Sequence, residues 1–409
     1  MLKCIPVSAL RIGMYIQEFS GSWMDHPFFK SSFLLKNEKD LQRIRDSGIA
    51  EVWIDADRGL DITSEIESRT VEQVATEVEA RLLAAEQKPS ILRSEMHEEL
   101  ERAAKICSDA KAAVITMFNG ARMGSAIDPE QAAKLIEEIA ASVRRHPYAL
   151  ISLARLKSAD EYTYMHSVAV CALMIALARQ LGMAESLVRE VGLAGLLHDI
   201  GKMTIPLAVL NKPGRLTDAE FEMMRKHPEE GGKILLENER ISALVFDVCL
   251  HHHERVDGTG YPHHLTGEQI SVFAKMGAVC DVYDAISSDR PYKKGWDPAE
   301  SISKMAEWCK GHFDEGVFQA FVKLVGIYPI GSLVRLKSGY IGVVIEQNDK
   351  SLLSPKVKVI FCSKSKAPVP QRVVDLASLD SHDKIISRES TGPWSNVDID
   401  KVWMDYIAE

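Results

Sequence analysis

Imidazole and carboxylate side chains are concentrated in two short segments of this 409-residue chain. The first segment contains His198 and Asp199, and the second contains His251, His252 and His253. Neutral imidazoles suit iron, manganese, nickel or zinc, and mixed ligation by histidine and carboxylate suits a centre with two metal ions. If the two segments meet in one cavity, the chain is a metal-dependent hydrolase.

The helix before the first segment decides how its two polar residues can be used. His198 and Asp199 follow the apolar run 193–197 and lie just before Gly201. Adjacent side chains on a helix point about 100° apart, so both can reach one cavity only where that cavity wraps around the helix end. Asp199 is the natural bridge, because one carboxylate can bind two cations through its two oxygens.

Three further candidate ligands lie on other expected helices. His166 starts an apolar helix, where a hydrogen-bonded core histidine is the alternative. His227 is expected to end the helix that Thr217 opens with a capping box (Thr217 and Glu220), where the alternative is a favourable contact with the helix dipole. Asp281 lies in an apolar stretch, where an unpaired carboxylate would be costly. Each residue alone is a weak signal, but the ordered set is specific.

These residues give the chain a resemblance to the HD-GYP family of cyclic-di-GMP phosphodiesterases, a branch of the HD metal-dependent phosphohydrolases. The resemblance covers roughly residues 129–325 and rests on residues 198–202, on 252–254 with 257–262, and on 281–292. The N-terminal segment also resembles an uncharacterised domain that often precedes this catalytic domain. The resemblance implies hydrolysis of cyclic-di-GMP to pGpG and GMP through a metal-bridging hydroxide.

Carried over by position, the resemblance implies two divalent metal ions, with iron expected and manganese or nickel as alternatives. One ion is held by His166, His198 and Asp281, the other by His227, His252 and His253, and Asp199 bridges them.

His251 falls outside this ligand set and is expected to pack or to form hydrogen bonds. Some family members bind a third metal through a glutamate four residues before the first histidine. Tyr162 occupies that position here, and Glu161 is one residue out of register. On a helix this shift turns the carboxylate by about 100°. We therefore expect two metals.

Cationic residues near the ligands are expected to act on the phosphate groups. Lys202, one helical turn from His198, is expected to contact a phosphate oxygen or to protonate the leaving ribose oxygen; a solvent-exposed cation is the alternative. The resemblance also implies that Arg290 and Lys293 bind phosphates, Arg290 through a bidentate fork. The alternative for both is a solvated loop charge.

The glycines and proline of Asp257–Pro262 predict a tight turn beside the ligands. Gly260, Tyr261 and Pro262 are expected to contact substrate, with Tyr261 stacked on a guanine. The alternative is that Tyr261 and Pro262 only make the loop rigid. The sequence does not separate the two.

Two other functions compete with this prediction. An HD phosphohydrolase acting on another cyclic dinucleotide or on a nucleotide would share most of these residues. A degenerate domain that binds cyclic-di-GMP and signals without turnover would have lost ligands, whereas all seven are present.

Composition restricts the partners and the compartment. The net charge is −9, with 58 acidic and 49 basic residues, which argues against nucleic acid polymers or a membrane surface as partners. Seven cysteines without a CxxC pair favour a reducing cytoplasm. The most apolar run, 168–178, is too short to span a bilayer.

The pattern predicts a multidomain, mainly α protein in which an all-α HD-type catalytic domain follows a small α/β domain and precedes a small antiparallel β unit. The N-terminal domain is expected to regulate the enzyme or to form homo-oligomers or contacts with regulatory proteins. The expected boundaries are 1–62 for the α/β domain, 63–128 for a helical connector, 129–325 for the catalytic domain, 326–378 for the β unit and 379–409 for a C-terminal tail.

Overall fold

The computed structural model describes residues 1–20, 32–62, 68–83, 96–125, 127–156, 162–212, 214, 216–237, 241–289, 294–348, 351–378, 381–390, 392–394 and 396–405. Arg290 and Lys293 lie outside these residues, and so does Glu161.

An antiparallel sheet and one helix form the N-terminal α/β domain. Its strand order is β3-β2-β4-β1-β5. Helix α1 begins where Asn37 accepts a hydrogen bond from the Asp40 amide, and its buried face packs with the sheet in a separate small core. The sheet and its helix confirm the small α/β domain that the sequence predicts. The elements are β1 (Leu2–Pro6), β2 (Tyr15–Phe19), β3 (Phe33–Leu34), α1 (Glu38–Arg45), β4 (Glu51–Asp55) and β5 (Arg69–Thr70).

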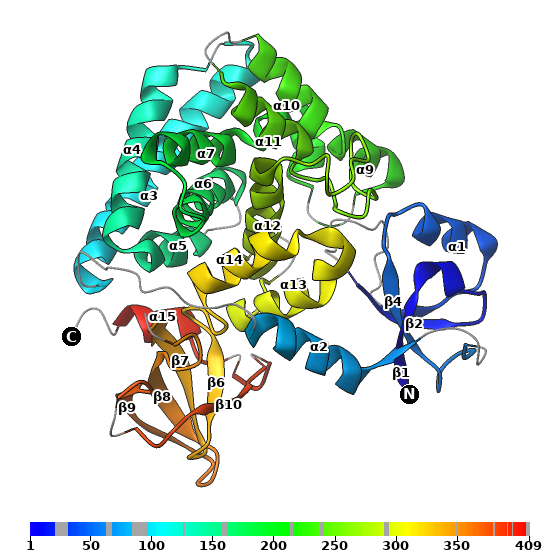
Figure 1. Cartoon of the computed structure of the whole chain (residues 1–409), viewed down its shortest axis with the longest axis vertical. Coiled ribbons are helices and arrows are strands. Elements are labelled where there is room, and N and C mark those ends of the chain that lie inside the picture. Colours follow the sequence, from blue (N-terminus) through cyan, green and yellow to red (C-terminus); the bar gives the residue numbers. More distant parts are fainter. Residues whose placement is uncertain are drawn as a thin grey trace.

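Helices make up most of the catalytic domain, as predicted. Helix α2 runs from the N-terminal domain alongside α13, and α6 packs among α3, α4, α5, α7, α12 and α14 (Figure 1). These elements are α2 (Val71–Leu83), α3 (Met96–Arg122), α4 (Pro129–Arg145), α5 (Pro147–Arg155), α6 (Tyr162–Gln180), α7 (Glu185–Leu197), η4 (Ile200–Thr204), α8 (Leu207–Leu210), α9 (Asp218–Met224), α10 (His227–Leu236), α11 (Ala243–His251), α12 (Val272–Ser287), α13 (Pro298–His312) and α14 (Glu315–Val325).

Helix α6 is the core of this domain. Every residue from Met165 to Ala178 is buried, and α6 packs against α3, α5, α7, α12 and α14. Among the described residues it is the one helix long and apolar enough to cross a membrane, but 78% of its most apolar window is buried inside the protein. Such burial on all sides is that of a core helix.

One predicted helix boundary is wrong. Thr217 opens α9 with the expected capping box, but α9 ends at Met224 and His227 is the first residue of α10. Proline has no N–H and is tolerated in the first turn of a helix, so Pro228 fits directly after His227 at the start of α10. His227 therefore lies at the start of a helix, and its alternative role, a favourable contact with the dipole at a helix C-terminus, does not apply.

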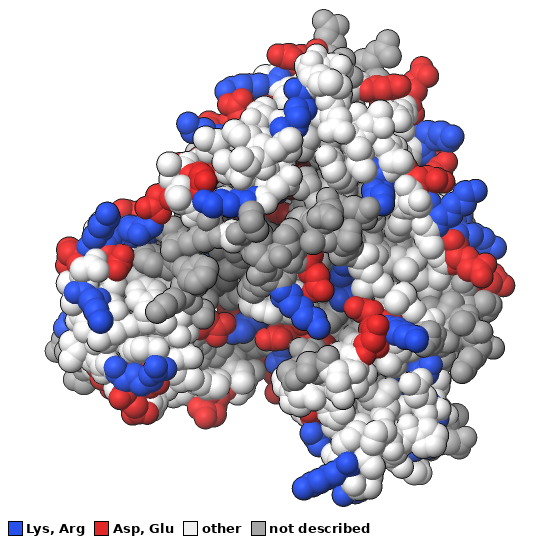
Figure 2. Space-filling model, turned by 180° about the vertical axis from the view of Figure 1, so that it is seen from behind, with Lys and Arg blue, Asp and Glu red and all other residues white. Residues whose placement is uncertain are grey.

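The C-terminal antiparallel sheet is confirmed, with strand order β10-β6-β7-β8-β9. The segment expected as a tail supplies β10, which pairs with β6, and the helix α15, whose Trp403 is buried. On the face shown in Figure 2, basic and acidic residues are interspersed. The elements are β6 (Leu333–Leu336), β7 (Tyr340–Glu346), β8 (Lys356–Cys362), β9 (Ala367–Asp375), β10 (Ile385–Arg388) and α15 (Ile399–Asp405).

Asp297 joins the catalytic helices to this sheet. Its Oδ1 accepts hydrogen bonds from the amides of Ala299 (2.8 Å) and Glu300 (3.3 Å) at the start of α13. Its Oδ2 accepts one from the Leu333 amide on β6 (3.0 Å). Burial raises the pKa of Asp297 from 3.8 to about 6, although these bonds oppose the shift.

We expect Asp297→Asn to destabilise the protein by about 1–3 kcal/mol at pH 5, because an amide N–H₂ would face the Leu333 N–H. A carboxyl whose pKa is raised by folding contributes its full stability below the unfolded pKa, and this contribution is lost as the pH rises through the folded pKa. Asparagine does not titrate, so the free energy of unfolding of the variant will differ less from that of the native chain at pH 8 than at pH 5. Urea unfolding at the two pH values measures it.

Asp314→Asn is the matched control, because Asp314 caps α14 with a pKa that is lowered despite burial. The destabilisation caused by Asp314→Asn should not become smaller between pH 5 and pH 8. Equal pH dependence of the two variants would contradict the role assigned to Asp297.

Candidate metal centre

Two clusters of candidate ligands lie side by side in the catalytic domain. In each cluster the ligand atoms are within 4.8 Å of one another. The residues come from α6, the end of α7, the first residue of α10 and the end of α11, so helices distant in sequence converge on one point. The first cluster is His166, His198 and Asp199, and the second is His227, His252 and His253.

Asp199 faces both clusters with different oxygens. Its Oδ2 lies 3.5 Å from Nε2 of His166 and 3.4 Å from Nε2 of His198. Its Oδ1 lies 3.2 Å from Nε2 of His227 and 3.9 Å from Nε2 of His252. This arrangement is the one that a bridging carboxylate requires.

Asp281, on α12, closes the first cluster. Its Oδ1 lies 2.9 Å from Nε2 of His166 and 3.8 Å from Nε2 of His198, and its Oδ2 lies 3.9 Å from Nδ1 of His253. The structure thus brings all seven sequence-predicted ligands together.

Hydrogen bonds behind the histidines orient their rings. The Nδ1 atoms of His198, His227 and His252 lie 2.8, 2.8 and 3.0 Å from backbone carbonyl oxygens. A carbonyl only accepts, so Nδ1 carries the hydrogen and Nε2 presents a lone pair to the centre. Nδ1 of His166 lies 2.6 Å from Oδ2 of the buried Asp284. Sequence reasoning gave Asp284 no role, although a second carboxylate three residues after Asp281 in an apolar helix was an available signal.

The donor set fits divalent cations. Nε2 of His198, Oδ1 of Asp199 and Oδ2 of Asp281 are buried and have no hydrogen-bond partner among the described residues. Burial and the neighbouring histidines lower the pKa of His252 to about 3. Although burial opposes ionisation of Asp199, Lys202 and His198 hold its pKa well below the usual value. Neutral imidazoles and ionised carboxylates are the forms that bind metals.

A glycine lets the two clusters approach. A Cβ on Gly201, in η4, would lie 1.9 Å from the carbonyl oxygen of His227 and 2.4 Å from the amide nitrogen of Gly231. No larger residue allows η4 and α10 to pack this closely. Their contact is what places His227 beside Asp199.

Glu254 shapes the loop that follows the histidines. Its buried carboxylate accepts hydrogen bonds from the amides of His263 (2.6 Å) and Leu265 (3.0 Å). A Cβ on Gly260 would lie 2.4 Å from the Arg255 amide nitrogen, so this glycine lets the loop fold back on itself. Sequence reasoning did not assign this role to Glu254.

The folded loop places Tyr261 against the second cluster. Its ring stacks on His253 with centroids 4.7 Å apart, and a cis peptide bond joins Tyr261 to Pro262. Lys202 forms an ion pair with Oδ2 of Asp199. The Lys202 side chain is 20% exposed, so its ammonium lies at the edge of the centre.

Two residues near the ligands do not join the clusters. The ring of Tyr162 stacks on His166 with centroids 5.5 Å apart, at the position where some family members have a glutamate. His251 lies outside both clusters, with Nδ1 2.7 Å from Oδ1 of Asp247 and Nε2 3.0 Å from Nδ1 of His263.

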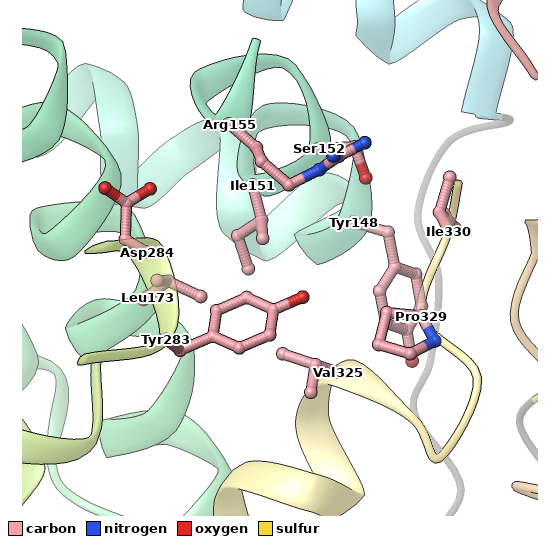
Figure 3. Close-up of a pocket in the computed structure, with 10 residues that line it drawn as sticks. All are labelled: Tyr148, Ile151, Ser152, Arg155, Leu173, Tyr283, Asp284, Val325, Pro329 and Ile330. Atoms are coloured by element: carbon pink, nitrogen blue, oxygen red, sulfur yellow. The ribbon is translucent and has the colours of Figure 1, made fainter. Parts of the chain in front are cut away.

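Two cavities adjoin this region. The cavity in Figure 3, lined by Tyr283 and Asp284 among others, has a volume of about 20 Å³, which has room for a water molecule and not for a nucleotide. The other has a volume of about 330 Å³ and reaches His253, Gly260 and Tyr261. The larger cavity is the candidate substrate site.

Comparisons with known proteins agree with this geometry. Residues 134–317 match the HD domain family, and residues 2–132 match a domain of unknown function, DUF3391. Over 404 residues the chain is 58% identical to the cyclic di-GMP phosphodiesterase PA4108 of Pseudomonas aeruginosa, covering 98% of this chain and 96% of the relative. The chain belongs to the HD-GYP family.

Other relatives match about a third of this HD-GYP protein. The cyclic di-GMP phosphodiesterase response regulator RpfG of Xanthomonas campestris is 41% identical over 155 residues, which are 36% of this chain and 40% of RpfG. The 3'3'-cGAMP-specific phosphodiesterase 2 of Vibrio cholerae is 36% identical over 139 residues, 34% of this chain and 27% of that protein.

Proposed function

We propose that this HD-GYP protein hydrolyses cyclic-di-GMP to pGpG and then to GMP. The observation that carries the proposal is Asp199, whose two oxygens face two separate histidine clusters. Nearly full-length similarity to a protein named as a cyclic di-GMP phosphodiesterase supports this choice of substrate.

The clusters would hold two divalent cations, with iron favoured and manganese or nickel as alternatives. One ion would be held by His166, His198 and Asp281. The other would be held by the second cluster (His227, His252 and His253), and Asp199 would contact both ions. Bound cations would neutralise phosphate charge and lower the pKa of water.

The chain's own residues would orient the substrate and move protons. Lys202 would donate a proton from Nζ to the leaving ribose oxygen, or contact a phosphate oxygen, once its ion pair with Asp199 opens. Tyr261 stacks on His253 and lies under the guanidinium of Arg225, so it would stack on a guanine once Arg225 moves aside. Gly260 and Pro262 would hold its loop. Arg290 and Lys293 remain proposed phosphate ligands.

The decisive experiment is product analysis with anaerobically purified protein loaded with iron, manganese or nickel. We expect pGpG to appear first and GMP later. Cyclic GMP-AMP belongs in the same panel, because relatives of this chain are specific for it. Cleavage of cyclic GMP-AMP alone would replace the proposed substrate, and no turnover with any of the three metals would contradict the proposal.

Lys202→Met should lower kcat by about 100-fold or more, because general acid catalysis typically contributes 10²- to 10⁴-fold. The substitution keeps the aliphatic stem and removes only the proton donor, so metal content should be unchanged. Single-turnover rates of the metal-loaded chain measure this loss of rate. Lys212→Met is the control, because it removes an ion pair with Glu220 that lies outside the two clusters. An unchanged rate in Lys202→Met would remove Lys202 from the mechanism.

We infer a cytoplasmic location for the protein. No disulfide joins the cysteines in the described part of the chain. The one described helix that is long and apolar enough to cross a membrane, α6, is mostly buried inside the protein. The domain matched by DUF3391 would regulate the enzyme or carry contacts with regulatory proteins or a second copy.

A further inference from the structure

The larger cavity lies between two domains. Helix α1 of the N-terminal domain supplies one wall, and the catalytic domain supplies the rest through α9, Arg225 and the loop after α11. Its volume is about 330 Å³. The lining residues that carry the inference are Lys39 and Arg43 from the N-terminal domain and Arg225, His253, Arg255 and Tyr261 from the catalytic domain.

This cavity adjoins the metal centre through His253. The His253 side chain is 11% exposed, whereas those of the other four cluster histidines are 0–2% exposed. A substrate in the cavity would therefore meet the centre at His253.

Built contacts hold the two walls together. Gly48, with a φ of +74°, packs so closely on the loop that a Cβ would lie 2.8 Å from the carbonyl oxygen of Thr259. Arg43 forms an ion pair with Asp218 at the start of α9. The Arg255 Nη1 donates a hydrogen bond to the Gly48 carbonyl (3.0 Å). The cavity is thus a defined space between packed domains.

Arg255 is the unsatisfied cation of this cavity. It is only 6% exposed, and its Nε is buried without a hydrogen-bond partner among the described residues. A guanidinium stays charged at all physiological pH values, so a buried N–H without an acceptor is costly. Nε and Nη2 form one edge of the guanidinium, and this geometry matches two oxygens of a phosphate.

Other charges in the cavity favour an anion at the same place. Arg43 is paired with Asp218, and Arg225 lies 3.7 Å from Glu222 while its guanidinium covers the Tyr261 ring. Lys39 is exposed and, like Arg255, has no acidic partner within the described part of the chain. Asp46 also lines the cavity, and its Oδ1 accepts a hydrogen bond from Gln42 (2.8 Å). The four cations of the lining therefore still outnumber its three carboxylates, and neither Lys39 nor Arg255 is held in an ion pair among the described residues.

We propose that the N-terminal domain completes the substrate site: Arg255 and Lys39 bind the phosphate of the cyclic dinucleotide that is not being hydrolysed. A cyclic dinucleotide has two phosphates, and only one can lie at the metals. This inference rests on the proposed function. It makes the N-terminal domain a determinant of substrate affinity.

Steady-state kinetics of the full-length, metal-loaded chain test the proposal. Lys39→Glu should raise KM for cyclic-di-GMP about fivefold with kcat nearly unchanged. Lys36→Glu makes the same change of charge at another exposed lysine, just before α1 and outside the cavity lining, and should have no such effect. Arg255→Gln should raise KM by tenfold or more, because it removes charge-assisted hydrogen bonds, and Arg255→Lys should recover part of the loss.

The substrate bis(p-nitrophenyl) phosphate has a single phosphate, so its hydrolysis should be unaffected by Lys39→Glu. Equal KM values for Lys39→Glu and Lys36→Glu with cyclic-di-GMP would overturn the proposal. Because Arg255 also bonds Gly48, a parallel loss on both substrates in Arg255→Gln would indicate damage to the loop and count against phosphate binding.

Binding of a hydrolysis-resistant phosphorothioate analogue of cyclic-di-GMP, measured by calorimetry, separates the two possible failures. Binding that depends on Lys39 and Arg255 in a chain without turnover would contradict the proposed function alone. Turnover with binding that depends on neither residue would contradict this inference alone.

Discussion

Replacing Asp199 with alanine will remove bound metal and reduce turnover at least about 100-fold. Loss of a residue that only supports a ligand already costs 10- to 100-fold in many metal sites. Asp199 faces both clusters directly, with Oδ1 3.2 Å from His227 and Oδ2 3.4 Å from His198. Metal per protein and initial rates, measured on the same anaerobic preparation, record both effects.

Asp199→Ala removes both the carboxylate that would bridge the two ions and the volume of the side chain. Asp199→Asn removes the negative charge and keeps the volume, so it separates these two effects. Asparagine keeps the volume and one acceptor oxygen but not the charge, so this variant should fold like the native chain and still fail to hold two ions. Asp284→Asn, which alters only the partner of His166 Nδ1, should have the smaller effect of a supporting residue. Full metal content and native turnover in Asp199→Ala would refute the binuclear centre.

Gly201→Ala will lower metal content and turnover although it changes none of the candidate ligands. Its methyl group would lie 1.9 Å from the His227 carbonyl oxygen, and backbone atoms cannot rotate away as a side chain can. We expect η4 and α10 to separate, with a destabilisation of about 1–3 kcal/mol. His227 would then withdraw from Asp199, and metal content and turnover would fall together.

Gly120→Ala is the matched control for this substitution. Gly120 lies in α3, and a Cβ there would meet only the Ser125 Cβ at an ordinary 3.6 Å. Alanine in a helix is favoured over glycine by about 0.5–1 kcal/mol, so this variant should be equally or more stable and fully active. Native metal content in Gly201→Ala would show that the η4–α10 contact does not position His227.

Two features of the fold could not be predicted from the sequence: the boundary between α9 and α10, and the strand β10. The capping box at Thr217 predicted where α9 begins, but its end and the start of α10 at His227 depended on how the chain turns onto Asp199. Strand β10 is mostly exposed, so it lacks the apolar alternation that marks β6 to β8. Its pairing with β6 is a long-range contact that local patterns do not encode.

By itself, the sequence predicted the seven residues that the structure brings together at the candidate metal centre, because residue type and order are local properties of the chain and carry the family resemblance. Apolar periodicity, which is also local, predicted the helices around them. Only the tertiary structure decided that Asp199 faces two clusters, that Glu254 folds the loop of Tyr261, and that α1 closes the cavity beside His253. Those relations join residues from different elements, some of them far apart in the chain. They are fixed by packing, as at Gly48 against Thr259 and Gly201 against His227, and close packing is a property of the assembled fold.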